Sequence, residues 1–352
     1  MQAIRKLLPK EIEILPVIKN DAYGHGLVEV AKTLASEQVY GFGLSEPYEA
    51  YLLRKAGLIH PILLLSGFEK DWLFDMYNLR IIPVVTSVHT MEWLAEFTYK
   101  KAIKWEFHLK INTGMNRFGV EKRDFAKILS ILKENPQLNV IGIMTHLACS
   151  ENSEHPLTIN QLKEFSEAIT YFKKKGINFK FIHLCNSGGI IFLKEKGNLV
   201  RPGIILFGGY PNFKARAHIK LYPVMTLKSK IVELKKLKPG ESVGYGATFK
   251  TSKKSVLAIV PVGYGDGYLR SLSNKGFAWI KGKRVPVVGT ISMNCLYLDV
   301  TEVNNVEIGD EVILLGGERE EVPVDELANL ADTISYELFC SLGKSIKRVY
   351  KE

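Results

Sequence analysis

The sequence predicts an α/β protein with an N-terminal (β/α)8 barrel followed by a mostly β C-terminal domain. Up to about residue 215, eight nearly continuous apolar segments alternate with amphipathic helical patterns. Segments that are apolar on both faces are typical of buried parallel strands joined by helical crossovers, and eight of them is the strand number of a (β/α)8 barrel. Beyond this point the chain consists of short β-rich runs separated by glycine-containing turns, which indicates a second, mostly antiparallel domain.

The eight predicted strands are regularly spaced along the first part of the chain. They cover residues 14–19, 40–45, 59–66, 81–87, 105–112, 139–146, 179–186 and 199–207. Helical patterns lie between them at 27–35, 46–57, 124–135 and 160–176. The last of these ends on Gly176, as expected for a helix C-terminus. A doubly wound open sheet is the alternative, but the glycine-rich dinucleotide fingerprint that would follow its first strand is missing.

We expect the domain boundary near residue 215, with the barrel over 1–215 and the β-rich domain over 216–352. Within the second domain, Lys281-Gly282-Lys283 has the pattern of a hairpin turn between two strands. Helix-length segments return only at about 324–343.

Composition narrows the class of protein. The formal net charge of +10 is scattered along the chain rather than gathered with aromatic residues in one block, so a nucleic-acid-binding surface is not expected. The four cysteines lie far apart without metal-ligand spacing, which predicts reduced thiols and no metal site. No apolar run is long enough to span a membrane, and the N-terminus is too charged for a signal peptide. These features predict a cytoplasmic protein.

Residues able to act as nucleophile, acid–base or anion ligand occupy five of the eight strand ends. In barrels the functional residues gather at the C-terminal ends of the strands. The candidates are Lys19, Lys110 with Asn112, His146, Asn186 with Ser187, and Arg201.

Lys19 is the first candidate. It ends an apolar strand and precedes NDAYGHG, in which Tyr23 offers a hydroxyl and Gly24 and Gly26 let the backbone approach a ligand closely. A lysine crowded by other cations can lose its proton and form a Schiff base. The alternative is a solvated lysine at a strand end.

A second candidate cluster lies in HLCNSGG (183–189) and RPGI (201–204). Glycine-flanked loops after strands seven and eight are where barrels commonly bind phosphate. Phosphate together with a Schiff-base lysine indicates pyridoxal phosphate (PLP). Gly188 and Gly189 are equally consistent with the start of a helix that binds no ligand.

The stretch VIKNDAYGHG (17–26) resembles the cofactor-lysine signature of the alanine racemases, the fold-type III PLP enzymes. The resemblance continues in order through LKINTGMNRFGV (109–120), THL (145–147), HLCNSGG, RPGI, VGYGATF (243–249), GYGDGYLR (263–270), SMN (292–294) and SYEL (335–338).

This resemblance implies a two-base racemisation of L- and D-alanine in a homodimer with shared sites, supplying D-alanine for peptidoglycan. Lys19 would serve one face of the substrate, and Tyr245 of the partner subunit, assisted by His146, the other. Arg201 would face the pyridine nitrogen of PLP. The other implied cofactor-binding residues are Tyr23, Asn186, Ser187, Gly203, Ile204 and Tyr336. The implied substrate-binding residues are Arg117, Met293 and Tyr264, supported by Arg270 and by Lys110, which is often carbamylated in the family.

Three departures from the family pattern stand out. Asn294 replaces the usual aspartate after the methionine, which removes a carboxylate near the substrate site, and Gly244 replaces the usual serine. Family members also carry an additional strand before the cofactor lysine that packs on the β-rich domain. Here either the start is truncated or the edge of that domain is bare.

Other functions stay open. A broader amino-acid racemase is a close variant of the leading hypothesis. A barrel-type PLP decarboxylase is a second class, but those enzymes lack the VGYGATF motif. A non-enzymatic PLP carrier would not need the second domain.

Overall fold

The computed structural model describes residues 1–342 and 346–351, and the chain folds into two compact units. The barrel unit comprises residues 1–22, 26–206 and 214–220. The β unit comprises residues 23–25 and 207–213 together with the described residues from 221 onward. Each unit is described by itself.

The barrel unit contains eight short parallel strands. Strands β2 to β7 form one sheet in sequence order, and β1 pairs with β8. The strands are β1 (Glu13–Ile14), β2 (Phe42–Leu44), β3 (Ile62–Leu64), β4 (Ile81–Val85), β5 (Trp105–Lys110), β6 (Leu138–Met144), β7 (Phe181–His183) and β8 (Leu199–Val200).

Backbone contacts close these strands into a barrel. Val17, just after β1, forms a parallel bridge with Gly43 of β2, and the Gly43 N–H donates to the Pro16 carbonyl at 2.8 Å. On the other side, the Arg201 N–H donates to the Cys185 carbonyl at 2.9 Å, which joins the segments after β8 and β7. The predicted (β/α)8 barrel is confirmed, and the open-sheet alternative is wrong because the first and last strands pair.

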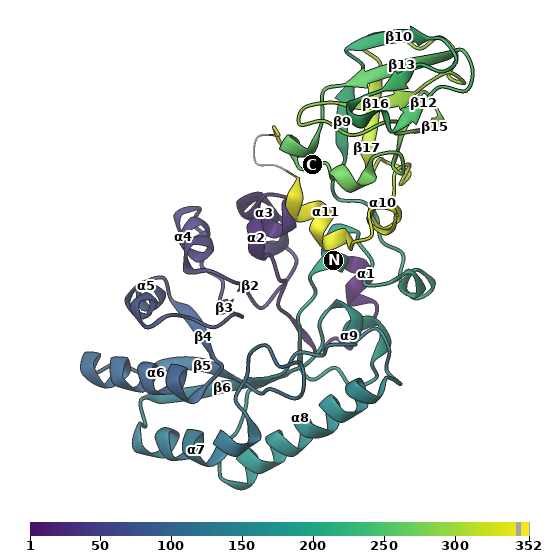
Figure 1. Cartoon of the computed structure of the whole chain (residues 1–352). Helices are drawn as coiled ribbons and strands as arrows, with labels where there is room; N and C mark the ends of the chain where they lie inside the picture. The colour runs from purple at the N-terminus through teal and green to yellow at the C-terminus, as the bar shows by residue number, and fades with distance from the viewer. Residues whose placement is uncertain (343–345, 352) are drawn as a thin grey trace. The chain divides into compact units, whose positions relative to one another are not determined.

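Helices α4 to α8 connect the strands and lie along the outer side of the curved sheet (Figure 1). The helical segments of this part of the chain are α1 (Gln2–Arg5), α2 (Lys19–Tyr23), α3 (Leu27–Ala35), α4 (Pro47–Lys55), α5 (Leu73–Asn78), α6 (Val88–Lys101), α7 (Phe125–Glu134), α8 (Pro156–Lys174) and α9 (Ser187–Phe192). Helix α8 begins earlier than predicted because His155 caps it, accepting the Leu157 N–H at 3.1 Å, and Pro156 occupies its first turn. None of the described helices has the length and apolar character needed to cross a membrane.

An apolar cluster packs among the strands of the barrel unit. Leu15, Leu63, Ile141, Phe181 and Leu199 form one buried cluster, each contributed by a different strand or its edge. This packed layer fixes the strands, so that their C-terminal ends can carry polar groups at defined positions.

The eighth strand is shorter than predicted. We expected it to run to residue 207, but β8 ends at Val200, and residues Ile204–Phe207 form a 3-10 helix. Pro202 has no N–H for a strand ladder, and the Gly203 N–H donates to the Ser187 hydroxyl at 3.0 Å instead of to a strand.

The β unit is built from antiparallel sheets, as predicted. Its sheets have the strand orders β10-β13-β16, β15-β14-β17-β9 and β11-β12. The strands are β9 (Leu227–Lys230), β10 (Glu233–Leu237), β11 (Ser242–Val243), β12 (Phe249–Lys250), β13 (Ser255–Val260), β14 (Phe277–Ile280), β15 (Lys283–Pro286), β16 (Leu296–Asp299) and β17 (Glu311–Leu315).

Two details of the β unit bear on the sequence predictions. Ile280 pairs with Lys283, so Lys281 and Gly282 form a two-residue hairpin turn, and both have positive φ. The helical segment expected at about 324–343 consists of two helices, α10 (Val324–Leu330) and α11 (Ser335–Ser341). Residue 343 lies outside the described part of the chain.

Candidate active site

Lys19, the predicted Schiff-base lysine, was expected to end the first strand, but β1 ends at Ile14, and Lys19 begins an unusual turn. Lys19 begins α2, and the four residues after it, Asn20 to Tyr23, all have φ of 53° or 54°. This is one turn of left-handed helix, which costs about 1–2 kcal/mol per residue for side chains other than glycine. The Ala22 N–H donates to the Ile18 carbonyl at 2.9 Å within it. Such a turn persists only where its surroundings hold it.

Gly24 ends the turn for a structural reason. Its φ is +80°, and a Cβ built on it would lie 2.2 Å from the Phe339 carbonyl oxygen of α11. The expected close approach of this glycine is therefore to backbone within the β unit. A side chain at this position would push α11 away.

A cluster of basic groups surrounds the ends of the barrel strands. Lys110 is only 4% exposed, and burial, followed by the charges of Arg201, Arg117 and Lys19, lowers its pKa to about 7. Burial, followed by the same cations and Lys110, holds the pKa of His146 well below its usual value. The barrel unit thus brings together five of the residues selected from the sequence.

Arg201 is the most buried cation of this cluster. It is 3% exposed, and burial lowers its pKa to about 10, which leaves it charged at neutral pH. One guanidinium nitrogen donates to the Thr145 carbonyl at 2.8 Å, and another lies 3.0 Å from Nδ1 of His183. These bonds fix the plane of the guanidinium.

Two histidines behind Arg201 were missed by sequence reasoning. Because arginine only donates, Nδ1 of His183 accepts, and its Nε2 carries the proton. That N–H donates to Nδ1 of His108 at 2.7 Å, so His108 is protonated on Nε2, which is buried without a protein partner. Burial lowers the pKa of His108 to about 3. A histidine inside an apolar strand, as in WEFHLK (105–110), was the available signal.

The loops after β7 and β8 meet through Ser187. Its hydroxyl accepts the Gly203 N–H at 3.0 Å, and Ile204 is buried. The Asn186 side chain caps α9 by accepting the Gly189 N–H at 3.0 Å. The double glycine therefore lies at the start of helix α9, and Ser187 lies in the first turn of that helix.

In the β unit, Tyr23 and Tyr336 bring two phenols near each other. Their ring centroids are 5.9 Å apart. Burial, followed by Tyr336 and Cys340, raises the pKa of Tyr23. Tyr23 therefore stays protonated and able to donate a hydrogen bond over the physiological pH range.

Neighbouring loops of the β unit carry Tyr245, Tyr264 and Met293. The Tyr264 N–H donates to the Ser292 carbonyl at 3.1 Å, so Tyr264 and Met293 lie on adjoining segments. The three side chains are 73%, 43% and 56% exposed, respectively. Arg270, in a 3-10 helix close along the chain, is also exposed.

The presence of glycine at position 244, where the family pattern has serine, has a structural reason. Its φ is +71° with ψ of −171°, a region that is almost restricted to glycine. A Cβ there would lie 3.1 Å from the Tyr297 ring. In this chain the turn that presents Tyr245 requires glycine.

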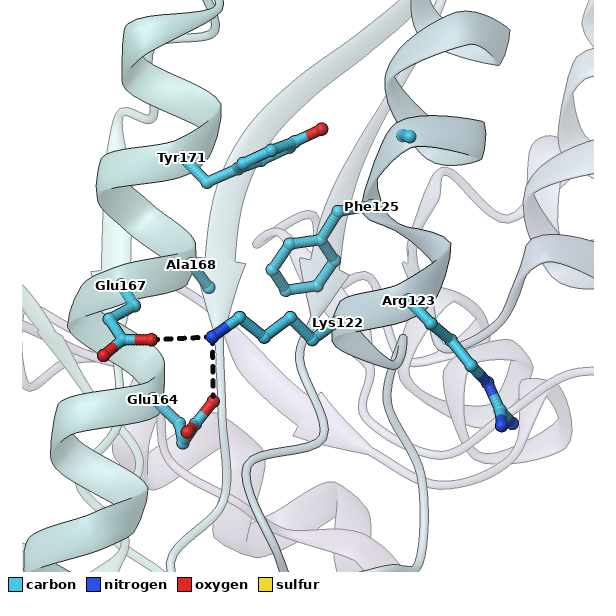
Figure 2. A pocket seen from close by; sticks show the side chains of 8 residues that line it. Lys122, Arg123, Phe125, Glu164, Glu167, Ala168 and Tyr171 are labelled. Atoms are coloured by element: carbon cyan, nitrogen blue, oxygen red, sulfur yellow. Dashed lines mark hydrogen bonds and ion pairs between the residues drawn. The ribbon is translucent and has the colours of Figure 1, made fainter.

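A surface groove of about 280 Å³ lies apart from these residues, between α7 and α8 (Figure 2). Lys122 crosses it to reach Glu167 at 2.8 Å and Glu164 at 4.0 Å, beside Phe125 and Tyr171. None of the residues selected from the sequence lines this groove.

The barrel cluster suits an anionic cofactor with an aldehyde. Lys19 supplies the primary amine, and every charge that shifts the pKa of Lys110 or His146 is a cation. Cations buried side by side repel each other, and a phosphate-bearing group would relieve that repulsion. The donors present therefore fit PLP.

Comparisons with known proteins agree over the whole chain. The family description "Alanine racemase, N-terminal domain" matches residues 1–211, and "Alanine racemase, C-terminal domain" matches residues 224–350. The alanine racemase of Halothermothrix orenii is 35% identical over 350 residues, which cover 99% of this chain and 92% of that protein.

Solved structures show the same likeness. The alanine racemase of Clostridium difficile has a TM-score of 0.92 at 33% identity, covering 99% of this chain and 92% of that one. The alanine racemase of Bartonella henselae, solved with covalently bound pyridoxal phosphate, has a TM-score of 0.89 at 30% identity, with 99% and 95% covered. This chain therefore belongs to the alanine racemase family of PLP-dependent isomerases.

Proposed function

We propose that this protein interconverts L- and D-alanine, using PLP held on Lys19. The observation that carries the proposal is the basic cluster that includes Lys19, in which burial and neighbouring cations lower the pKa of Lys110 to about 7. Lys19 is one of the cations that act on both Lys110 and His146, so its primary amine lies in the same cluster.

Racemisation needs one proton removed from Cα on one face and another delivered on the opposite face. When bound, PLP acts as an electron sink that acidifies the Cα–H. Lys19 serves one face. Tyr245 serves the other from the partner subunit, which its 73% exposure supports, because an exposed phenol is available to a second chain. His146 assists the proton transfer at the tyrosine hydroxyl.

The remaining site residues are proposed to bind and orient the cofactor and the substrate. Arg201 would face the pyridine nitrogen of bound PLP, and because a guanidinium only donates, it would favour the unprotonated form of that nitrogen. Arg117 and the Met293 amide hold the substrate carboxylate, with Tyr264 beside them and Arg270 supporting. The cofactor is further bound by Tyr23, Asn186, Ser187, Gly203, Ile204 and Tyr336.

Lys110 is proposed to carry a carbamate in the working enzyme. A pKa of about 7 leaves about half of its amine neutral at pH 7, and only the neutral amine reacts with carbon dioxide to give a carbamate and a proton. The resulting anion would offset the positive charge of the cluster and brace Arg117.

We further propose a homodimer with shared sites, a barrel domain over 1–215 and a β-rich domain over 216–352 that delivers Tyr245 to the partner. The four cysteines are free thiols, which supports a reducing, cytoplasmic location. D-alanine made there would supply cell-wall peptidoglycan.

The test is spectroscopic first and kinetic second. With PLP added, the purified protein should show a visible absorbance band that borohydride removes. The reduced cofactor should then be attached covalently to Lys19, and no such attachment should form in Lys19→Ala. Both alanine enantiomers should then exchange their Cα hydrogen in deuterated water. If no band forms, the cofactor assignment fails. If the band forms but alanine does not exchange, a decarboxylase or a carrier becomes the better assignment.

A further inference from the structure

Glu49 is a buried carboxylate with no part in the chemistry proposed above. It lies in the first turn of α4 and is 8% exposed. Its two oxygens accept the Asp21 N–H at 3.3 Å and the Ser45 N–H at 3.2 Å. The Asn20 N–H also bonds to it. A side chain from a different helix thus binds the first two amides after Lys19.

The left-handed turn has a separate anchor at its other end. The Asp21 side chain accepts the Leu27 N–H at 2.8 Å, and the Gly26 N–H donates to the Asp21 carbonyl at 2.9 Å. These bonds connect the turn to α3, which follows it in sequence. Of these two anchors, Glu49 binds the amides nearer to Lys19. It belongs to α4, a helix outside the turn.

We propose that Glu49 is a positioning residue, which holds the left-handed turn so that Lys19, directly before Asn20, is presented in one fixed orientation for bond formation with PLP. The inference rests on the proposed role of Lys19. It assigns no contact between Glu49 and the cofactor or the substrate.

The chemistry of the anchor requires a carboxylate. Glu49 binds three backbone N–H groups and, at 3.4 Å, the Ser45 hydroxyl, all of which can donate. A glutamine of the same shape would aim its NH2 group at one of these donors, whichever way the amide is turned. Burial raises the pKa of the carboxyl, whereas the backbone bonds favour its charged form.

The experiment compares Glu49→Gln with two controls on the same helix. Glu46→Gln removes the same charge from an exposed position at the start of α4. Ala50→Gly weakens the helix next to Glu49 without touching the carboxylate. For each protein, PLP affinity is measured by titrating the visible band, and cofactor orientation by its visible circular dichroism. The rate of borohydride-fixed labelling at Lys19 is followed by mass spectrometry.

We expect Glu49→Gln to lose PLP affinity by about tenfold to a hundredfold, as for the loss of hydrogen bonds to a charged group. Its circular dichroism band should weaken, and its Lys19 labelling should slow. Both controls should match the wild type. Unchanged affinity and circular dichroism in Glu49→Gln would overturn the inference, and so would an equal loss in Ala50→Gly, which would make the effect one of helix stability.

A rescue separates positioning from a general loss of stability. Ala22 has φ of 53°, and glycine adopts this conformation without steric cost. The double variant Glu49→Gln, Ala22→Gly should therefore regain part of the lost affinity. No regain would contradict the claim that Glu49 acts by holding the turn.

Amide hydrogen exchange tests the inference even if Glu49→Gln does not fold. In the wild-type apoprotein, the Asn20 and Asp21 amides should exchange slowly, and fast exchange at both would overturn it. Failure of the wild type to bind PLP would instead reject the proposed function, so the two failures are distinguishable.

Discussion

The two units present their functional groups in opposite ways. In the barrel unit, Lys110 and Arg201 are 4% and 3% exposed, and their pKa values are set by burial and by each other. In the β unit, Tyr245 and Met293 are 73% and 56% exposed. The barrel groups are tuned by their own chain, whereas the β-unit groups lie on a surface. This difference is what a site completed by a second chain requires.

The largest effect should follow from removing the exposed phenol. Tyr245→Phe should lower racemisation in both directions by about 10²–10⁴-fold, as for the loss of a general acid–base group. Exchange of the Cα hydrogen should persist for one alanine enantiomer, because Lys19 still serves its face. Deuterium incorporation measured separately for L- and D-alanine checks this.

Tyr222→Phe is the matched control, since Tyr222 is also an exposed tyrosine of the β unit. It should racemise at the wild-type rate. Equal loss of exchange for both enantiomers in Tyr245→Phe would contradict a two-base division of labour.

The burial of Lys110 in the barrel unit predicts that the free energy of unfolding depends on pH. The folded-state pKa of Lys110 is about 7, below its ordinary value of 10.5. Between these values the unfolded chain binds more protons, so the free energy of unfolding rises with pH across this window. From pH 7 to 10 the gain should be about 3 kcal/mol for the apoprotein, and Lys110→Met should lose it.

Denaturant unfolding in buffers free of carbon dioxide measures this gain, because carbamylation would otherwise change the titrating group. Lys133→Met, which removes an exposed lysine of α7, should keep the wild-type slope. A Lys110→Met protein with that same slope would show that the cluster does not depress the pKa of Lys110.

A smaller effect is expected at the turn that presents Tyr245. Gly244→Ser should lower the free energy of unfolding by about 2 kcal/mol, because the φ of +71° with ψ of −171° suits only glycine. Gly282→Ser is the control: its φ is +79°, but nothing lies near its Cβ position. If the two variants lose equal stability, neither the backbone region of Gly244 nor the nearby Tyr297 ring adds to the cost of a side chain there.

The smallest effect should come from the groove between α7 and α8. Lys122→Ala breaks exposed ion pairs to Glu167 and Glu164, which solvent screens, so the free energy of unfolding should hardly change. Racemisation should not change. A drop in kcat for this variant would mean that the groove between α7 and α8 affects the candidate active site.

The barrel could be predicted because its strands are buried on both faces and therefore read as apolar runs. The strand end at Lys110 followed from that prediction, whereas Lys19 lies beyond the end of β1 and Arg201 just after the end of β8. The end of the eighth strand could not be placed, because it depends on the Gly203 N–H finding the Ser187 hydroxyl, a partner 16 residues away.

Other parts of the site left weaker signals in the sequence. The left-handed turn after Lys19 begins with Asn20 and Asp21, residues that are common in ordinary turns, and its anchor Glu49 lies on another helix. The bond between His108 and His183 spans 75 residues. Both depend on tertiary contacts that local sequence patterns do not encode.

The central claim, a site completed by two chains, is tested most directly by mixing inactive variants. Lys19→Ala and Tyr245→Phe are each unfolded, refolded together and assayed for alanine racemisation. If the sites are shared, a mixed dimer has one intact site, and activity should recover to about a quarter of the wild-type value for random pairing of a symmetric dimer. If each chain completes its own site, the mixture will be no more active than the separate variants, and the claim is contradicted.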